Sequence, residues 1–441
     1  MSRRVLIICP AFPPLSTPDL QRVRMSLPHY AETDWEATVL TVDPALQDGA
    51  REEALLETLP PETRIVRCGA LPLRLSRRLG IGNLGLRAWW PLFSTGSRLL
   101  REGRFDLVFF STTQFAVLPM GRLWRRRFGV PYLIDLQDPW RTDYYERPGV
   151  RKPPGGWKYQ AARLQARVLE GWTFRRMDGL MSVSEAYLRD LGARYPWFGS
   201  VPSAVIPFGI SRSDLDCARG LGATPGERAP SAPVRLVYTG AAGPVTPHAA
   251  TVLFGALAQL RREAPEQALS LRLEFIGTSY APAERARPTV LPLAATAGVS
   301  DLVREEPARQ GYLETLRVQQ TSDVLLLLGS SDRAYSPSKL YPYLLSGRPI
   351  LSLVFSDSVL ASILQELNCP MTVILDEEAG VEAATRALCT HLRAAANLRQ
   401  LPLPVPTLPE SFEERYLAPA LTRRQASLFE RALDHHERAV R

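Results

Sequence analysis

The most constraining feature of the sequence is a helix signal set between two short apolar runs. Residues 323–328 and 350–355 are the two runs, and each has the length and composition of a strand that is buried on both faces. Between them, Ser336 is typical of an N-cap, Pro337 of a first helical residue and Gly347 of a helix stop. This order predicts a parallel βαβ unit whose helix begins at the carboxyl end of a strand, where open α/β sheets bind ligands.

The first turn of this predicted helix contains a lysine, Lys339. The unpaired N–H groups and the macrodipole already make the potential positive there, so a cation is locally unfavourable. An anion held between the helix N-terminus, the Ser338 hydroxyl and Lys339 would relieve the repulsion, and phosphate is the usual anion at such a place. Lys339 is one of only three lysines among 53 basic residues. Two interpretations of Lys339 fit this pattern: it binds a phosphate, with Tyr341 of the same helix as a further donor contact, or it is a solvated surface lysine.

Short apolar runs alternate with helix signals along nearly the whole chain, which favours parallel βαβ winding. The expected strands are residues 5–9, 37–42, 64–67, 107–111, 132–136, 179–183, 204–206, 234–238, 271–276, 323–328, 350–355 and 372–375. Residues 214–233, rich in Gly, Pro, Ala and Ser, interrupt the pattern and are expected to be a linker.

The predicted fold class is therefore α/β, with two doubly wound Rossmann-like domains that face a cleft. Residues 1–213 form the first domain and residues 234–410 the second. The helical stretch 411–441 has no strand after it, so it should lie on the surface of a domain. It could cross back to the first domain and pack there.

Length, composition and charge narrow the class of protein. A chain of 441 residues with 45% apolar and 22% charged residues fits a globular protein of two or three domains. The formal charge of +8 favours anionic partners, but no nucleic-acid-binding motif is present. The five cysteines lie far apart, which argues against both a disulfide framework and a zinc site. The first apolar run ends at Pro10, too early for a signal peptide or a membrane span, so a cytoplasmic location is expected.

Polar residues of the first domain follow two of its predicted strands. Asp138 and Arg141 lie in the loop after the strand 132–136, at the edge where an α/β fold carries chemistry. Asp138 is a candidate catalytic carboxylate, and a turn ahead of Pro139 is the open alternative. Arg22 lies on a predicted helix away from its apolar face, where an acceptor contact and a solvated side chain are both open. In the second domain, Gly240 lies in the turn after the strand 234–238 and is a candidate contact for the donor.

The segment 71–101 combines Trp and Leu with several arginines. Such a composition suits an interfacial segment on an anionic membrane. A core-facing helical segment with a basic outer face is the alternative, and both are kept.

Five stretches taken together resemble the GT-B-fold glycosyltransferases of family 4; they are residues 5–14, 132–140, 205–209, 236–240 and 336–351. The resemblance covers nearly the whole chain, and the order and spacing of the stretches are its specific part. It implies that the first domain binds a glycan or lipid-linked acceptor and that the second binds a nucleotide-sugar. No cofactor and no bound metal are implied.

The sequence departs from the family pattern at two places. Members commonly carry an arginine and a lysine after the first strand of the second domain, whereas residues 240–248 contain neither. They also commonly carry two glutamates eight positions apart, where this chain has Ala334 and Pro342. The loss of a ribose-holding carboxylate bears on the identity of the donor, whereas Ser338 and Lys339 remain suited to a diphosphate.

The implied reaction sets chemical requirements that some of these residues meet. Glycosyl transfer builds negative charge on the departing diphosphate, and without a metal fixed cations such as Lys339 must stabilise it. Asp138 suits the orientation or deprotonation of an acceptor hydroxyl. Two other classes stay open: a non-catalytic binding protein with the GT-B fold, and a nucleotide-dependent oxidoreductase. The second is disfavoured because no G-x-G-x-x-G follows the strands 5–9 and 234–238.

Overall fold

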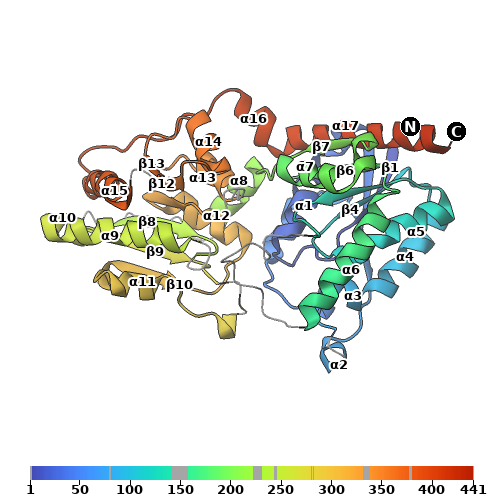
Figure 1. Cartoon of the computed structure of the whole chain (residues 1–441), viewed down its shortest axis with the longest axis horizontal. Helices are drawn as coiled ribbons and strands as arrows, with labels where there is room; N and C mark the ends of the chain where they lie inside the picture. The colour runs from blue at the N-terminus through green and yellow to red at the C-terminus, as the bar shows by residue number, and fades with distance from the viewer. Residues whose placement is uncertain are drawn as a thin grey trace. The chain divides into compact units, whose positions relative to one another are not determined.

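The chain divides into two compact units, each an α/β structure with a parallel sheet between helices (Figure 1). The computed structural model describes residues 2–78, 81–141, 157–221, 231–242, 246–279, 281, 283–330, 338–376 and 380–440. Unit 1 comprises Met1–Gly209 and Glu413–Arg441, and unit 2 comprises Ile210–Phe412. Two sheets of seven and six parallel strands confirm the predicted class of two doubly wound domains.

The sheet of unit 1 has the strand order β3-β2-β1-β4-β5-β6-β7. Its strands are β1 Arg3–Ile8, β2 Trp35–Val42, β3 Arg64–Cys68, β4 Leu107–Ser111, β5 Tyr132–Leu136, β6 Gly179–Ser182 and β7 Ser203–Val205. The register pairs Val5 with Leu107 and Ile8 with Phe110. Strand order reverses between β1 and β4, which makes the carboxyl ends of these two strands the topological switch point of the unit.

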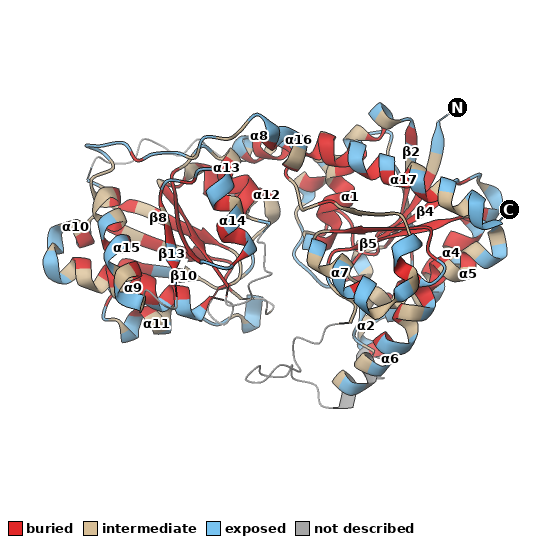
Figure 2. Cartoon of the chain, turned by 45° about the horizontal axis from the view of Figure 1, so that its top comes forward, coloured by how far each residue is buried: buried red, intermediate tan, exposed pale blue. Residues whose placement is uncertain are grey.

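Alternate residues of the unit 1 strands enter two separate cores, because successive side chains of a strand point to opposite faces. Leu6 and Ile8 join the core beneath helices α4 and α5, whereas Val5 and Ile7 join the core beneath α1 and α17. The strands are therefore buried on both faces, as Figure 2 shows in red. This double burial explains why they read as continuous apolar runs.

The helices of unit 1 include one from the far end of the sequence. They are α1 Gln21–Ser26, α2 Leu73–Arg78, α3 Leu84–Arg87, α4 Trp89–Glu102, α5 Pro119–Phe128, α6 Trp157–Phe174, α7 Glu185–Arg194, α16 Ser411–Tyr416 and α17 Ala418–Val440, with α16 crossing the boundary between the units. Helix α17 packs on the sheet through Leu421, Phe429 and Ala432.

Unit 2 repeats the doubly wound order as β10-β9-β8-β11-β12-β13. Its strands are β8 Val234–Thr239, β9 Leu271–Ile276, β10 Val303–Glu306, β11 Val324–Leu328, β12 Ile350–Phe355 and β13 Thr372–Leu375. Its helices are α8 Arg212–Gly220, α9 Pro247–Glu263, α10 Pro265–Leu269, α11 Leu291–Thr296, α12 Tyr312–Thr321, α13 Leu340–Leu345, α14 Val359–Glu366 and α15 Gly380–Ala396. The switch point of this unit lies between β8 and β11.

Three elements differ from the sequence-based expectation. The first seven residues of the expected linker 214–233 lie in helix α8, because Leu215 and Ala218 are buried against unit 2, while residues 222–230 lie outside the described residues. Strand β10 was not predicted, since only Val303 of its four residues is apolar and the strand forms the edge of the sheet. The helix expected at 337–346 begins only at Leu340; Ser336 and Pro337 lie outside the described residues.

Part of the segment 71–101 packs into the core of unit 1, whereas Trp90 is exposed. Leu92, Leu99 and Leu100 are buried, and the guanidinium of Arg87 donates hydrogen bonds to the carbonyls of Leu71 and Leu46. These contacts favour the interpretation of the segment as a core-facing helical segment over the interpretation as a membrane-interfacial one.

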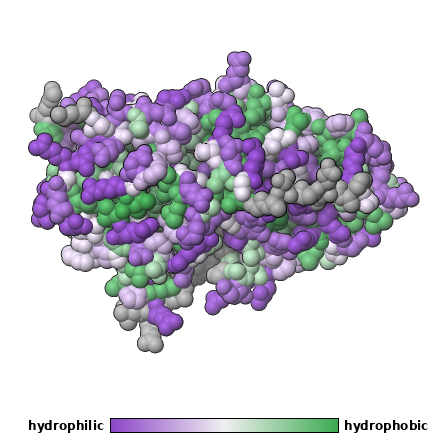
Figure 3. Space-filling model, turned by 180° about the vertical axis from the view of Figure 1, so that it is seen from behind, coloured by the Kyte–Doolittle hydropathy of each residue, from purple (hydrophilic) through white to green (hydrophobic). Residues whose placement is uncertain are grey.

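One face of the molecule is mainly polar. Hydrophilic side chains cover most of the face in Figure 3, with smaller hydrophobic areas between them. Of the helices described here, none combines the length and the apolar character that crossing a membrane requires.

Candidate functional site

Both switch points carry polar side chains, which makes them the candidate ligand-binding edges of the two units. In unit 2 this edge contains Thr239 and Gly240 at the end of β8 and is reached by Lys339. In unit 1 it contains Ser111 and Thr112 at the end of β4, and Asp19 reaches it from the loop after β1.

Lys339 closes over the end of β8 instead of extending into solvent. Its Nζ donates a hydrogen bond to the Thr239 carbonyl at 3.1 Å and lies 3.4 Å from the centre of the Tyr238 ring. A β-carbon placed on Gly240 would lie 3.9 Å from this Nζ, so the backbone at Gly240 borders the ammonium. Gly240 has a φ of 98°, a conformation that favours glycine. The ammonium and the bare backbone at Gly240 together suit an anion.

Tyr343 of α13 also anchors Thr239, the last residue of β8. The Tyr343 hydroxyl accepts a hydrogen bond from the Thr239 backbone N–H at 3.0 Å and lies 3.2 Å from Thr239 Oγ1. Gln319 of α12 donates to that hydroxyl oxygen of Thr239 at 2.9 Å. Thr239 is thus held at its N–H, its carbonyl and its side chain, which fixes the loop around Gly240 relative to Lys339.

The ammonium of Lys339 lies in an unfavourable electrostatic environment. Burial lowers its pKa well below the usual value, and the positive charge of Arg309 lowers it further. Within the described part of the chain no carboxylate forms an ion pair with Lys339. A bound anion would restore the charged form, because an opposite charge nearby raises the pKa of a lysine.

The remaining donor-side residues have different surroundings. Ser338 is exposed in the turn before α13, whereas Tyr341 and Pro342 are buried within that helix. The phenol ring of Tyr341 therefore packs in the core of unit 2. Because α13 has only six residues, the helix dipole proposed for the anion site is short, and the argument depends on Lys339 itself.

Arg22 is buried in unit 1 instead of lying on a solvated face. Its Nε lies 2.9 Å from Asp135 Oδ2 as an ion pair, and its terminal nitrogens donate to the carbonyls of Ile206 and Pro207 at 2.8 and 3.3 Å. Both members of the pair are almost completely buried. Removing one partner of such a pair leaves an uncompensated buried charge, so Arg22 holds the end of β5 to the loop after β7.

A hydrogen-bonded network surrounds the Asp135 carboxylate. Ser111 Oγ and Gln137 Nε2 each donate to Asp135 Oδ2 at 2.9 Å, and Gln137 also donates to the carbonyl of Asp19 at 3.0 Å. Thr112 Oγ1 lies 3.4 Å from Asp19 Oδ2. Asp135 Oδ1 is buried without a partner among the described residues. The network orients the loops after β1, β4 and β5 at the switch point.

Asp138 is exposed in the loop directly after this network. Desolvation by the surrounding protein raises the pKa of its carboxyl, and the negative charge of Asp19 adds to the rise. A carboxylate with a raised pKa is a stronger base, which suits the role considered for Asp138. Arg141 lies apart from the Asp135 network: its carbonyl accepts a hydrogen bond from Arg194 at 3.5 Å.

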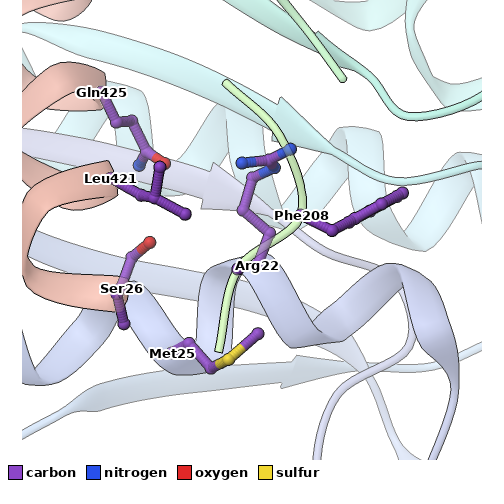
Figure 4. Close-up of a pocket in the computed structure, with 8 residues that line it drawn as sticks. Arg22, Met25, Ser26, Phe208, Leu421 and Gln425 are labelled. Atoms are coloured by element: carbon purple, nitrogen blue, oxygen red, sulfur yellow. The ribbon is translucent and has the colours of Figure 1, made fainter. Parts of the chain in front are cut away.

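A small pocket in unit 1 adjoins the buried arginine (Figure 4). Met25 and Ser26 of α1, Phe208 of the loop after β7, and Leu421 and Gln425 of α17 line it together with Arg22, Gly209 and Ala418. The guanidinium of Arg22 also lies 5.7 Å from the Phe208 ring. Because this guanidinium is already paired, the pocket offers mainly apolar contacts.

Several polar residues of these sites were not singled out from the sequence. Gln137, Gln319 and Arg309 carried no local signal, because the groups on which they act lie far away in the sequence. Among the described residues, no group of three His, Cys, Asp or Glu side chains is arranged to hold a metal ion.

Comparison with known proteins identifies the family of unit 1. Residues 21–209 match the sequence model of the glycosyl transferase 4-like domain, which is less than half of the chain. No curated protein has a significantly similar sequence.

Solved structures resemble the chain over its whole length. Anabaena HepE in complex with UDP is 13% identical with a TM-score of 0.51, over 99% of this chain and 98% of that one. A Burkholderia xenovorans UDP-forming trehalose-phosphate synthase in complex with glucose-6-phosphate is 12% identical with a TM-score of 0.54, over 99% of both chains. The N-terminal domain of Candida albicans trehalose-6-phosphate phosphatase is 13% identical with a TM-score of 0.56, over 99% and 97%. At these identities the likeness establishes the fold.

The fold and the family match together define the class. Unit 1 carries a glycosyl transferase 4-like domain and the whole chain has the GT-B fold, so the resemblance expected from the sequence is confirmed. The family match is to the glycosyl transferase 4-like part of unit 1, and the likeness of fold extends over the whole chain.

Proposed function

We propose that the protein transfers a sugar from a nucleotide-sugar to a glycan or lipid-linked acceptor without a bound metal. The observation that carries the proposal is the ammonium of Lys339, held beside the Gly240 backbone at the switch point of unit 2 with no carboxylate partner in the described residues. HepE, which shares the fold, was solved with UDP, which supports a nucleoside diphosphate as the ligand.

In the proposed reaction the bond between the anomeric carbon and the diphosphate breaks, and an acceptor oxygen bonds to that carbon. The proton of the acceptor hydroxyl passes to a base, for which Asp138 is the candidate because its pKa is raised. Lys339 stabilises the negative charge that develops on the departing diphosphate. Arg309, whose charge acts on Lys339, supplies positive potential that residues 240–248 lack.

The acceptor side is proposed for unit 1. Arg22 would act there by fixing the loop after β7, since its guanidinium is already paired, and Arg141 stays a candidate acceptor contact. We further propose a cytoplasmic protein of polysaccharide biosynthesis that contacts the inner face of a membrane, where lipid-linked acceptors occur.

The test is a thermal-shift screen of nucleoside diphosphates followed by calorimetric titration of the best one. Lys339→Met keeps an apolar stem against Tyr238 and removes the charge. Because a hydrogen bond to a charged group contributes about 1.5–3 kcal/mol, we expect binding to weaken roughly 10- to 100-fold. Arg285→Met, an exposed cation of the same unit, is the control and should bind like the wild type. Equal affinity of Lys339→Met and the wild type would mean that the donor site has been misassigned.

A second candidate is a non-catalytic protein that binds a nucleoside diphosphate. Pro342 favours it, because a buried proline stands where the family commonly carries a glutamate. Incubation with the sugar nucleotide that corresponds to the tightest diphosphate separates the two. Slow release of diphosphate, accelerated by acceptor, indicates the transferase, whereas tight binding with no release indicates the binding protein.

A further inference from the structure

Helix α6 exposes a ridge of apolar side chains that the proposed transfer reaction does not use. Leu164, Val168 and Trp172 are 63%, 61% and 39% exposed, and they follow one another at intervals of four residues. Residues four apart lie on the same face of a helix, so these three form one continuous stripe. Exposed aliphatic residues in such a row differ from the isolated ones that any protein surface shows. We refer to these three residues as the α6 ridge.

Arginines surround one end of the α6 ridge. The Arg122 guanidinium of α5 lies 4.3 Å from the Trp172 ring and donates to the Trp172 carbonyl. Arg126, Arg175 and Arg176 are exposed nearby, and their positive charges add to the effect of burial in lowering the pKa of Arg122. We refer to these four arginines as the α5–α6 arginine cluster. The charges of the other three arginines all act on Arg122, so the local potential is positive.

Neither α5 nor α6 carries an exposed acidic side chain that would offset the cluster. Across Pro119–Phe128 and Trp157–Phe174, the sole acidic residue is Glu170. Glu170 is buried and accepts hydrogen bonds from Arg194 at 2.6 Å and from Tyr195 at 2.9 Å. Asp178, which follows the helix, is likewise buried and paired with Arg125. The outer surface of α5 and α6 therefore presents apolar and cationic groups together.

We propose that the α6 ridge and the α5–α6 arginine cluster form a docking surface for an anionic phospholipid bilayer. Leu164 and Val168 enter the boundary between headgroups and acyl chains, Trp172 lies at headgroup level, and the arginines bind lipid phosphates. Helices α5 and α6 pack side by side on one face of unit 1 (Figure 1), and Arg122 of α5 contacts Trp172 of α6, which joins the two groups.

Two other occupants fit the surface less well. A second copy of the chain would bring like-charged arginines together across a two-fold axis, which is unfavourable. A nucleic acid would bind the arginines through its phosphates, but it offers no partner for the aliphatic side chains of Leu164 and Val168. A bilayer satisfies both the charges and the apolar stripe.

The experiment is flotation of the full-length protein with vesicles of equimolar phosphatidylglycerol and phosphatidylcholine, and with phosphatidylcholine alone. We expect the wild type to float with the anionic vesicles only and to detach as salt rises. Leu164→Gln/Val168→Gln should weaken partitioning about tenfold, which corresponds to about 1.4 kcal/mol. Arg175→Glu/Arg176→Glu should weaken it on the order of thirtyfold at low salt. These exposed substitutions should leave the circular dichroism spectrum unchanged.

Matched controls come from exposed residues of unit 2. Leu401→Gln/Val405→Gln makes the same loss of apolar surface, and Arg285→Glu/Arg287→Glu makes the same change of net charge. Both should float like the wild type. Trp90→Ala on α4 tests the segment 71–101, because Trp90 is its most exposed aromatic residue.

Several outcomes would overturn the proposal. Failure of the wild type to float at low salt excludes the bilayer, and equal losses in ridge and control variants exclude this surface. Loss only with Trp90→Ala assigns the contact to α4. A dimer that Leu164→Gln/Val168→Gln dissociates, without vesicle binding, identifies a second copy as the occupant, and binding of RNA that the arginine variant abolishes identifies a nucleic acid. Because flotation needs no nucleotide, its result is independent of the proposed transfer reaction.

Discussion

Lys339 is a charged side chain held by a carbonyl oxygen and an aromatic ring. The Thr239 carbonyl and the Tyr238 ring both attract an ammonium, but neither neutralises it, and the Arg309 charge opposes it. The side chain is therefore placed before any ligand binds, and its charge is weakly compensated. Such preorganisation suits a group that must stabilise charge on a departing diphosphate.

The lowered pKa of Lys339 predicts that nucleotide binding is linked to proton uptake. In the free protein the pKa lies well below its usual value, and a bound diphosphate raises it, so at a pH between the two values binding takes up a proton. Affinity should therefore fall as the pH rises through that window. Above about pH 8 the ligand itself no longer titrates, because a phosphate has its second pKa near 6.

Calorimetric titrations at one pH in two buffers with different ionisation enthalpies measure this uptake. The wild type should give buffer-dependent enthalpies, whereas Lys339→Met should not. Equal enthalpies for the wild type in both buffers, or the same uptake in the variant, would contradict a role for the Lys339 ammonium.

The sequence predicted which strands are followed by polar side chains, but not which of these side chains pair with one another. Lys339 was found because a capped helix follows an apolar run, yet the structure shows it half-buried instead of exposed. For Arg22 the sequence left an acceptor contact and a solvated side chain open, and its pairing with Asp135, 113 positions away, could not be read from local sequence. Long-range ion pairs leave no periodic signal, which is why the site was less predictable than the fold.

Elements were predicted well where both faces of a strand are buried. Strands β1, β4, β5, β11 and β12 consist mainly of apolar residues and were all expected, whereas the polar edge strand β10 was not. Helix α13 is shorter than its cap signals suggest. A strand that is buried on both faces must consist mainly of apolar residues, whereas an edge strand can carry polar ones.

The close approach of α5 to the sheet of unit 1 depends on Gly121. A β-carbon there would lie 2.5 Å from Cδ2 of Tyr132 and 2.9 Å from Cε2 of Phe110, both buried ring atoms. Gly121→Ala should therefore destabilise the protein by about 1–3 kcal/mol through overpacking, despite the better helix propensity of alanine. Urea unfolding monitored by circular dichroism measures the difference.

Gly192 of α7 is the matched control, because it is also helical but has no atom within 4 Å of the added carbon. Gly192→Ala should be neutral or stabilising by up to about 1 kcal/mol. If Gly121→Ala proved as stable as Gly192→Ala, then α5 would be able to move away from the sheet at little cost.

At the scale of the whole molecule, the two units differ in how their cores are assembled. The main core of unit 2 draws on residues between Val234 and Leu403 only. The core of unit 1 beneath α1 is completed by Phe429 of α17, whose ring centre lies 5.1 Å from that of Trp35 and 5.2 Å from that of Phe109. The first unit is therefore discontinuous in sequence and needs the end of the chain.

This difference predicts that residues 210–412 fold alone, whereas residues 1–209 do not. Without α17 the sheet of unit 1 exposes the apolar face that contains Val5, Ile7 and Phe109, and exposed apolar surface of this extent promotes association. A peptide of residues 413–441 added to the fragment 1–209 should restore a cooperative unfolding transition and near-ultraviolet circular dichroism. The same peptide with Phe429→Ala should do so poorly, since such a truncation costs about 3–5 kcal/mol. A fragment 1–209 that unfolds cooperatively by itself would show that α17 only covers a core that is already formed.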